Sequence, residues 1–293
     1  MTDTVANLHR KINTAKDLQS VVRTMKAMAA SNIGQYQNSV RALVDYTRTV
    51  ELGLAACLRE QSASTSAMEE AKTVNKVFAA IVFGSDQGLV GQFNNVVSDY
   101  VISSLAELSG EAHIWAVGER VHARLADAGL PMLGLFTLPH SVKAIAPFVG
   151  QMQIEMEKHQ SQCHYSELYI FHNRPQNGSF YEPIKHRLLP LDWQWQQRLR
   201  KMPWPSKNLP QVLCAGTATL TSLIREYLFI SLFRACAESL ASENASRLAA
   251  MERADKNIQE LLENLHVSYH QLRQSLIDEE LFDVIAGYES LTS

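Results

Sequence analysis

Both ends of the chain carry long helical patterns, and this pair of patterns constrains the fold more than any other feature. In residues 4–59 apolar or small side chains recur every three or four positions, and the first proline is Pro131. The same period returns in residues 211–285, again without a proline. A helix of about 50 residues is about 75 Å long at 1.5 Å per residue, several times the usual length in a globular domain. We therefore predict that the two terminal helices pair with each other in a coiled coil.

Between these helices the pattern becomes that of a small α/β domain. Compact apolar runs such as 76–84 alternate with helical stretches such as 93–108, and the last expected strand can lie antiparallel to the one before it. The predicted fold class is α/β: a long antiparallel coiled coil of the N- and C-terminal helices plus a small Rossmann-like domain. The predicted parts are an N-terminal coiled-coil helix at 1–60, a linker at 61–75, the α/β domain at 76–191, a Trp- and Pro-rich connector at 192–210 and a C-terminal coiled-coil helix at 211–293.

Composition narrows the function classes. Hydrophobic residues make up 46% of the 293 positions and charged residues 19%, which is ordinary for a soluble protein with a core. The formal net charge of −3 argues against nucleic-acid binding by the whole surface. No apolar run approaches the roughly 20 residues of a membrane span, and no signal peptide precedes the first patterned residue. We expect a cytoplasmic protein that is peripheral if it works at a membrane.

Sequence motifs for catalysis are not found. The loop at 84–94 lies between an expected strand and an expected helix, where phosphate-binding loops occur. Its glycines, Gly84, Gly88 and Gly91, match neither the dinucleotide fingerprint nor the mononucleotide P-loop, so a tight structural turn is the favoured interpretation. Asp86 alone cannot organise a metal site. There is no HExxH and no G-x-S-x-G motif, and we predict a non-catalytic protein without cofactor or metal.

Three stretches resemble the γ subunit of rotary F-type ATP synthases, and the resemblance covers nearly the whole chain. Residues 11–31, KINTAKDLQSVVRTMKAMAAS, are similar to that family's N-terminal coil signature. Residues 85–94, SDQGLVGQFN, are similar to its S-D-R-G-L-C-G-G-F-N loop. Residues 239–257, SLASENASRLAAMERADKN, followed by 265–287, resemble its C-terminal signature in both order and spacing. The C-terminal match is the most specific of the three.

The resemblance implies a central rotor shaft that couples ion flow through a membrane ring to ATP synthesis or hydrolysis on other subunits. The implied partners are the α and β subunits of the catalytic ring, the ε subunit and the membrane c-type rotor ring. The chain would bind no nucleic acid and no nucleotide of its own, and would be peripheral at the cytoplasmic face of the plasma membrane. The Ala- and Ser-rich stretch of the last helix would keep the shaft slim, although helix propensity alone explains the alanines equally well.

The resemblance also implies contacts with the β subunit. Met25 matches a hydrophobic contact with the acidic lever of β and has basic neighbours, and two later sites match the C-terminal signature. Without the resemblance, a solvated helix face would be the favoured interpretation of each charged residue, since exposed ion pairs contribute only about 0–1 kcal/mol. The implied β-contact residues are Arg23, Met25, Lys26, Arg247, Arg273 and Gln274.

The loop at 84–94, which we call the foot loop, departs from the family pattern. Gln87, Val90 and Gln92 stand where Arg, Cys and Gly are usual, which leaves the loop's polar contact with β open. Such departures favour a divergent γ subunit, of the alternate (N-type) F-type ATPase that some bacteria and archaea carry beside their main enzyme. The implied foot-loop residues are Asp86, Gln87, Gly88 and Gly91.

Two other functions stay open at the level of sequence. One is a free-standing adaptor, an α/β domain with a coiled-coil arm. The other is a small nucleotide-dependent enzyme that uses the loop at 84–94.

Overall fold

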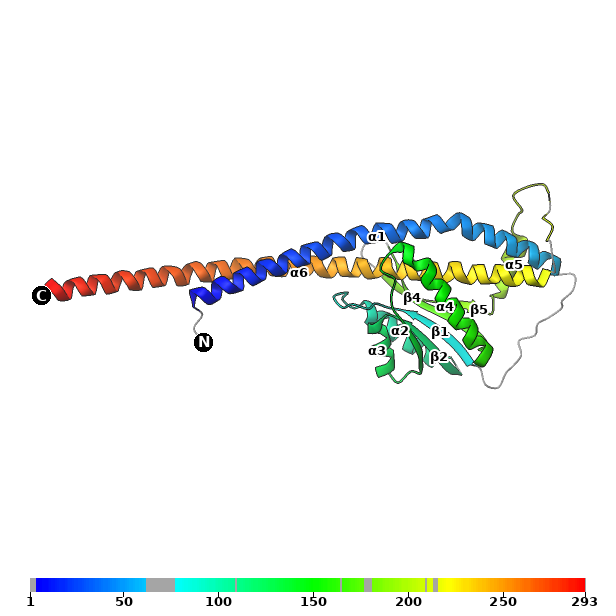
Figure 1. Cartoon of the computed structure of the whole chain (residues 1–293), viewed down its shortest axis with the longest axis horizontal. Coiled ribbons are helices and arrows are strands. Elements are labelled where there is room, and N and C mark those ends of the chain that lie inside the picture. The colour runs from blue at the N-terminus through cyan, green and yellow to red at the C-terminus, as the bar shows by residue number, and fades with distance from the viewer. Residues whose placement is uncertain are drawn as a thin grey trace. The chain divides into compact units, whose positions relative to one another are not determined.

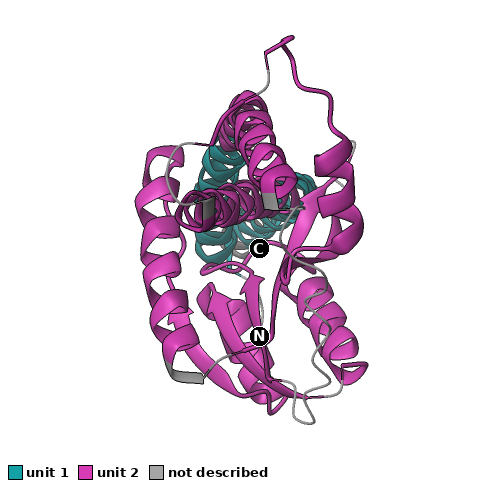
Figure 2. Cartoon of the chain, turned by 90° about the vertical axis from the view of Figure 1, so that its right-hand side faces the viewer, with its two compact units in different colours: residues 1–29, 248–293 teal, residues 30–247 magenta. Residues whose placement is uncertain are grey.

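The computed structural model describes residues 4–61, 77–108, 110–163, 165–176, 181–208, 210–212 and 216–292. The linker expected at 61–75 lies outside these residues, apart from its first position. The chain divides into two compact units, residues 1–29 with 248–293 and residues 30–247 (Figure 2). Two long helices, α1 (Val5–Gln61) and α6 (Gly216–Thr292), contribute residues to both units (Figure 1).

The first unit is a pair of helices. Ile12 and Ala15 of α1 are buried against Leu262 of α6, and Ile258, Leu265 and Tyr269 pack around them. Ion pairs join Arg23 to Asp255 and Lys26 to Glu252. Residue numbers rise along α1 as they fall along α6, so the helices run antiparallel. This confirms the predicted pairing of the two ends of the chain.

The second unit contains a five-stranded sheet in the order β3-β2-β1-β4-β5. Parallel pairing joins the first four strands, and β5 runs antiparallel to β4, as the sequence predicts. The run Val77–Phe83 is apolar throughout because both faces of the sheet are covered. The strands are β1 (Val77–Phe83), β2 (Glu111–Val117), β3 (Met132–Phe136), β4 (Glu167–Pro175) and β5 (Tyr181–Leu189).

Helices cover both faces of this sheet. On one face, α2 (Phe93–Ala106) and α3 (Glu119–Asp127) pack against alternate residues of β1, including Val82. On the other face, α4 (Val142–Cys163) and the first half of α6 pack against the intervening residues, including Ile81. Alternation along each strand therefore divides its side chains between two apolar clusters.

The C-terminal part of α1 and the N-terminal part of α6 also pack on each other within the second unit. Val50, Leu54 and Leu58 of α1 share a cluster with Ile230 of α6. Leu199 joins this cluster from α5 (Trp193–Lys201), a helix that the sequence analysis did not predict inside the connector. Among the residues that the structure describes, none of the helices is both long and apolar enough to span a bilayer.

Two glycines give a matched test of this packing. A Cβ at Gly84 would lie 2.4 Å from the Cβ of Val121, which is fully buried in α3, whereas a Cβ at Gly150 in α4 would meet nothing within 4 Å. We expect Gly84→Ala to lower the free energy of unfolding by about 2 kcal/mol or more through overpacking. Gly150→Ala should raise it by about 0.5–1 kcal/mol through helix propensity. Urea unfolding of the full chain measures both, and equal stabilities for the two variants would contradict this packing.

Candidate functional site

The loop at 84–94 follows β1, the strand at which the order of the sheet reverses. Crevices at such a point hold the ligands of many open α/β sheets. Here the loop presents side chains rather than a glycine-lined cradle: Gln87, Leu89 and Gln92 are exposed, Leu89 by 63%. Leu89 has φ 62° and Gly91 has φ 55°, so two residues of this turn adopt the left-handed conformation. For leucine that conformation is strained.

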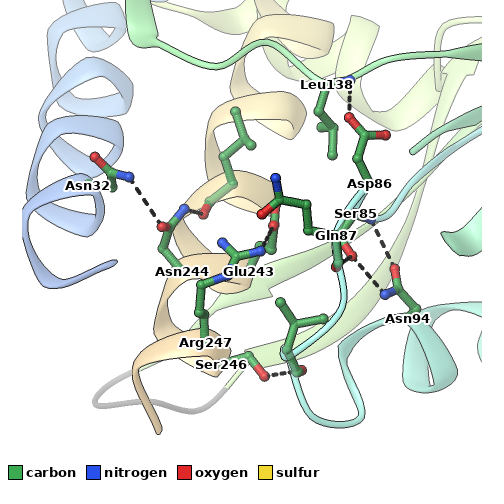
Figure 3. Close-up of polar contacts among 12 residues, drawn as sticks. Asn32, Ser85, Asp86, Gln87, Asn94, Leu138, Glu243, Asn244, Ser246 and Arg247 are labelled. Atoms are coloured by element: carbon green, nitrogen blue, oxygen red, sulfur yellow. Dashed lines mark hydrogen bonds and ion pairs between the residues drawn. The ribbon is translucent and has the colours of Figure 1, made fainter. Parts of the chain in front are cut away.

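Inner polar groups hold the loop in shape (Figure 3). The side chain of Asn94 accepts a hydrogen bond from the Ser85 amide at 3.0 Å and donates one to the Ser85 hydroxyl at 2.8 Å. Asp86 accepts from the amide of Glu119 at 3.1 Å and, through its other oxygen, from the amide of Leu138 at 2.9 Å. Both carboxylate oxygens therefore tie the loop to the start of α3 and to the segment after β3, which supports its interpretation as a structural turn.

The first part of the C-terminal signature, residues 239–247, lies on the stretch of α6 that crosses the sheet. Residues 235–246 are all buried, so the helix is covered on every side. Tyr36 of α1, sheet residues such as Ile170 and the α4 residue Met152 belong to the same apolar cluster as Ala237 and Ala241. Small side chains are needed here because the neighbouring elements approach the helix closely from all directions. The slimness attributed to a shaft is thus already required by packing inside this chain.

Three residues spaced by four on α6 reach the sheet side through hydrogen bonds, and we call Glu238, Ser242 and Ser246 the polar row. A carboxylate oxygen of Glu238 lies 2.9 Å from Nε2 of His172 in β4. The Ser242 hydroxyl donates to the carbonyl oxygen of Asn173 at 2.9 Å. The Ser246 hydroxyl donates to the carbonyl oxygen of Val90 in the foot loop at 2.5 Å (Figure 3). A spacing of four places all three on one face of the helix.

Charges accompany the polar row. Burial alone would raise the pKa of Glu238, but hydrogen bonds from His172 and Arg234 hold it below its ordinary value. Glu243 lies beside the row and pairs with Arg247 at 2.6 Å, with only 7% and 13% of the two side chains exposed. Burial raises the pKa of the Glu243 carboxyl, although Arg247 acts against this rise.

The predicted β-contact residues are divided between the two units. Arg247 belongs to the second unit and is engaged with Glu243. The others belong to the first unit, where Arg23 pairs with Asp255 at 3.2 Å and Lys26 with Glu252 at 3.7 Å. Met25, which lies between Arg23 and Lys26 in the sequence, is half-buried. Arg273 and Gln274 are exposed and lie about 27 Å further along α6 than Asp255, by helical rise.

Sequence reasoning missed the polar row and its partner His172. The signal was present as polar residues at positions 238, 242 and 246, although Ser239, Glu243 and Asn244 between them are polar as well. Within the described ranges, no group of three or more His, Cys, Asp or Glu side chains is arranged to hold a metal ion.

The pair Glu243–Arg247 gives a prediction with a defined pH dependence. Arg247→Met leaves a buried carboxyl without its cation, so the free energy of unfolding should fall by about 3 kcal/mol or more. The loss should be larger at pH 7.5 than at pH 5, because a carboxyl whose folded pKa is raised contributes stability that is lost as pH rises through that pKa. Denaturant unfolding at both pH values measures it.

Two further variants serve as controls for this pair. Arg253→Met, on an exposed face of the same helix, should change stability by about 0.5 kcal/mol or less. Adding Glu243→Gln to Arg247→Met should restore most of the loss, since the uncompensated charge is then absent. A loss of equal size for Arg247→Met and Arg253→Met would show that the buried pair has no special role.

Comparisons with known proteins agree with this fold. The family model described as ATP synthase matches residues 4–291. The ATP synthase gamma chain of Brevibacillus brevis is 26% identical over 292 residues, covering 97% of this chain and 97% of the relative. That of Desulforamulus reducens is 26% identical over 295 residues, covering 97% and 98%.

Solved rotors share the fold. The rotor of the Euglena gracilis mitochondrial ATP synthase aligns with a TM-score of 0.62 at 19% identity, covering 93% of this chain and 98% of that one. The central stalk of the Tetrahymena thermophila mitochondrial ATP synthase aligns with a TM-score of 0.56 at 20% identity, covering 80% and 99%. Because the family model matches almost every residue and the relatives match end to end, this chain belongs to the ATP synthase gamma-chain family.

Proposed function

We propose that this chain is the central rotor shaft of an F-type ATP synthase, and that it couples ion flow through a membrane ring to ATP synthesis or hydrolysis on the α and β subunits. The observation that carries the proposal is the antiparallel pairing of the two chain ends along the first unit. Membership of the gamma-chain family supports it, as do the rotor and central-stalk structures that share the fold. In this role the chain is not itself catalytic.

The helices have the properties that a shaft requires. α1 has 57 residues and α6 has 77, and neither contains a proline, so no residue of the kind that most often kinks a helix interrupts them. Buried Ile12, Ala15 and Leu262 form the seam of the pair in the first unit. A packed pair of helices resists bending and twisting better than either helix alone.

The exposed side chains at the far end of α6 support a partner-binding surface there. Its last described side chains include a concentration of exposed large apolar residues, which soluble monomers rarely present in one place. We infer that the α and β subunits enclose this stretch, near Arg273 and Gln274. The exposed residues, between 42% and 70% accessible, are Leu276, Ile277, Leu281, Phe282, Val284 and Ile285.

Charged contacts with β play a smaller part in this proposal. Arg23 and Lys26 are partly exposed and already paired with carboxylates of α6, and such pairs contribute only about 0–1 kcal/mol. Torque would pass mainly through the stiffness and shape of the helix pair. The shaft would act on β by fitting its alternative conformations unequally at different angles of rotation.

The remaining partners follow from the same role. We infer that the α/β domain of the second unit is the foot that joins the ε subunit and the c-type rotor ring, at the cytoplasmic face of the plasma membrane. The residues Gln87, Val90 and Gln92 of the foot loop support a divergent γ subunit of the alternate F-type ATPase.

Assembly with partner chains tests the proposal. Co-expressed with the α and β chains and the membrane subunits of the same organism's ATP synthase, the full chain should be recovered in a stoichiometric complex that pumps ions when ATP is added. Removal of residues 271–293 should reduce ATP-driven pumping at least tenfold and leave more of the ATP hydrolysis, because the enclosed end of the shaft is lost. Recovery of the chain without α and β would favour the adaptor, and tight stoichiometric nucleotide binding by the isolated chain would favour the enzyme.

Met25 provides a point test of the β contact. Met25→Lys places a charge where the resemblance implies an apolar contact, so the ratio of ions pumped to ATP hydrolysed should fall more than the hydrolysis rate does. Ala27→Lys adds the same charge about 200° around α1 at an exposed position and should have the smaller effect. Membrane vesicles containing each complex report both activities. Full pumping by the Met25 variant would show that this contact does not exist.

A further inference from the structure

The contact between α6 and the sheet within the second unit combines two kinds of interaction. Most of it is apolar and made by small residues such as Ala237 and Ala241. Apolar burial has no preferred direction, so it does not by itself select one rotation of the helix over another. Hydrogen bonds depend on both distance and angle, and the polar row supplies them.

The three bonds of the polar row are anchored at different places on the sheet side. Glu238 meets a side chain of β4, Ser242 meets a β4 backbone carbonyl, and Ser246 meets a carbonyl of the foot loop. Together they span eight residues, about 12 Å of helix axis. A rotation of α6 by about 100°, the angle between successive residues, would break all three hydrogen bonds. A shift of α6 along its axis by one helical turn would break them as well.

Polar atoms in this contact are not all satisfied. His172 Nδ1, Asn173 Oδ1 and Ser239 Oγ are buried and have no hydrogen-bond partner among the described residues. Unpaired buried polar atoms lower stability, so a contact selected for stability alone would be apolar throughout. Buried polar groups that lower stability are best known for fixing the register of packed helices.

We propose that Glu238, Ser242 and Ser246 are positioning residues that fix the rotation and axial position of α6 on the sheet. By holding α6 in place, these residues would also pass torque between the foot and the shaft. This second role rests on the proposed function, since a rotor must pass rotation between its foot and its shaft without slip. His172 is the hydrogen-bond partner of Glu238, and its ring is buried beside the Glu238 carboxylate. A hydrogen bond between these two groups depends on their relative orientation.

Replacing the row by apolar residues separates positioning from simple stabilisation. The fourfold variant His172→Leu, Glu238→Leu, Ser242→Ala and Ser246→Ala removes both His172 and Glu238, so it leaves no buried carboxylate without its partner. Spin labels on genetically encoded unnatural residues at the exposed positions Glu107 and Ser222 leave the native cysteines in place. Pulsed electron resonance of the full chain then gives the distribution of distances between the sheet domain and α6.

For the wild-type chain we expect one narrow distance distribution. In the fourfold variant it should broaden at least twofold or split, while the urea midpoint stays the same or rises. Ser231→Ala is the matched control, because that hydroxyl bonds to the Tyr227 carbonyl of α6 itself, and it should keep the narrow distribution. Glu238→Gln, which can still accept a hydrogen bond from His172, should keep it too.

Each outcome decides the proposal. A narrow, unshifted distribution in the folded fourfold variant overturns it. If that variant does not fold, Ser242→Ala with Ser246→Ala is measured in the same way, and an unchanged distribution there overturns it equally. In the assembled complex the ratio of ions pumped to ATP hydrolysed should fall at least twofold; a full ratio with a broadened distribution overturns the torque role alone. Failure of the wild-type chain to assemble would contradict the proposed function and leave the spectroscopic result on register standing.

Discussion

Burial of α6 on every side, from residue 235 to 246, is the constraint on which the rest of the second unit depends. A helix enclosed in this way must carry small side chains, because neighbouring elements occupy the space that larger ones would need. Small side chains in turn give a contact with little directional character. The polar row supplies the direction, and it requires the foot loop to present the Val90 carbonyl in a fixed place. Asn94 and Asp86 hold the loop so that it does.

Charge is distributed differently in the two units. Within the second unit, Glu238 and Glu243 are buried and each has a cationic or imidazole partner, so removing one partner would be costly. Within the first unit, pairs such as Arg23–Asp255 are partly exposed to solvent, where ion pairs are weak. Charges in the second unit therefore depend on their partners, while the surface of the first unit has charges that can exchange partners at little energetic cost.

Much of the fold follows from periodicity in the sequence. Proline-free heptad-like patterns predicted the helices and their antiparallel pairing, and the alternation of apolar runs with helical stretches predicted the strands. The helix α5 was missed because nine residues containing two tryptophans show no clear period, although Asp192 is a good N-cap and does accept a bond from the Trp195 amide. The polar row was missed for another reason: a serine on a helix does not reveal which neighbour its hydroxyl will meet. The β contacts cannot be derived from one chain, since side chains such as Arg273 are exposed within it.

The left-handed backbone at Leu89 bears on how the foot loop can change over evolution. Glycine and asparagine adopt this conformation with less strain than leucine, and neither would expose a large apolar side chain to water. As far as this chain's own packing is concerned, the loop can therefore accept either residue at position 89.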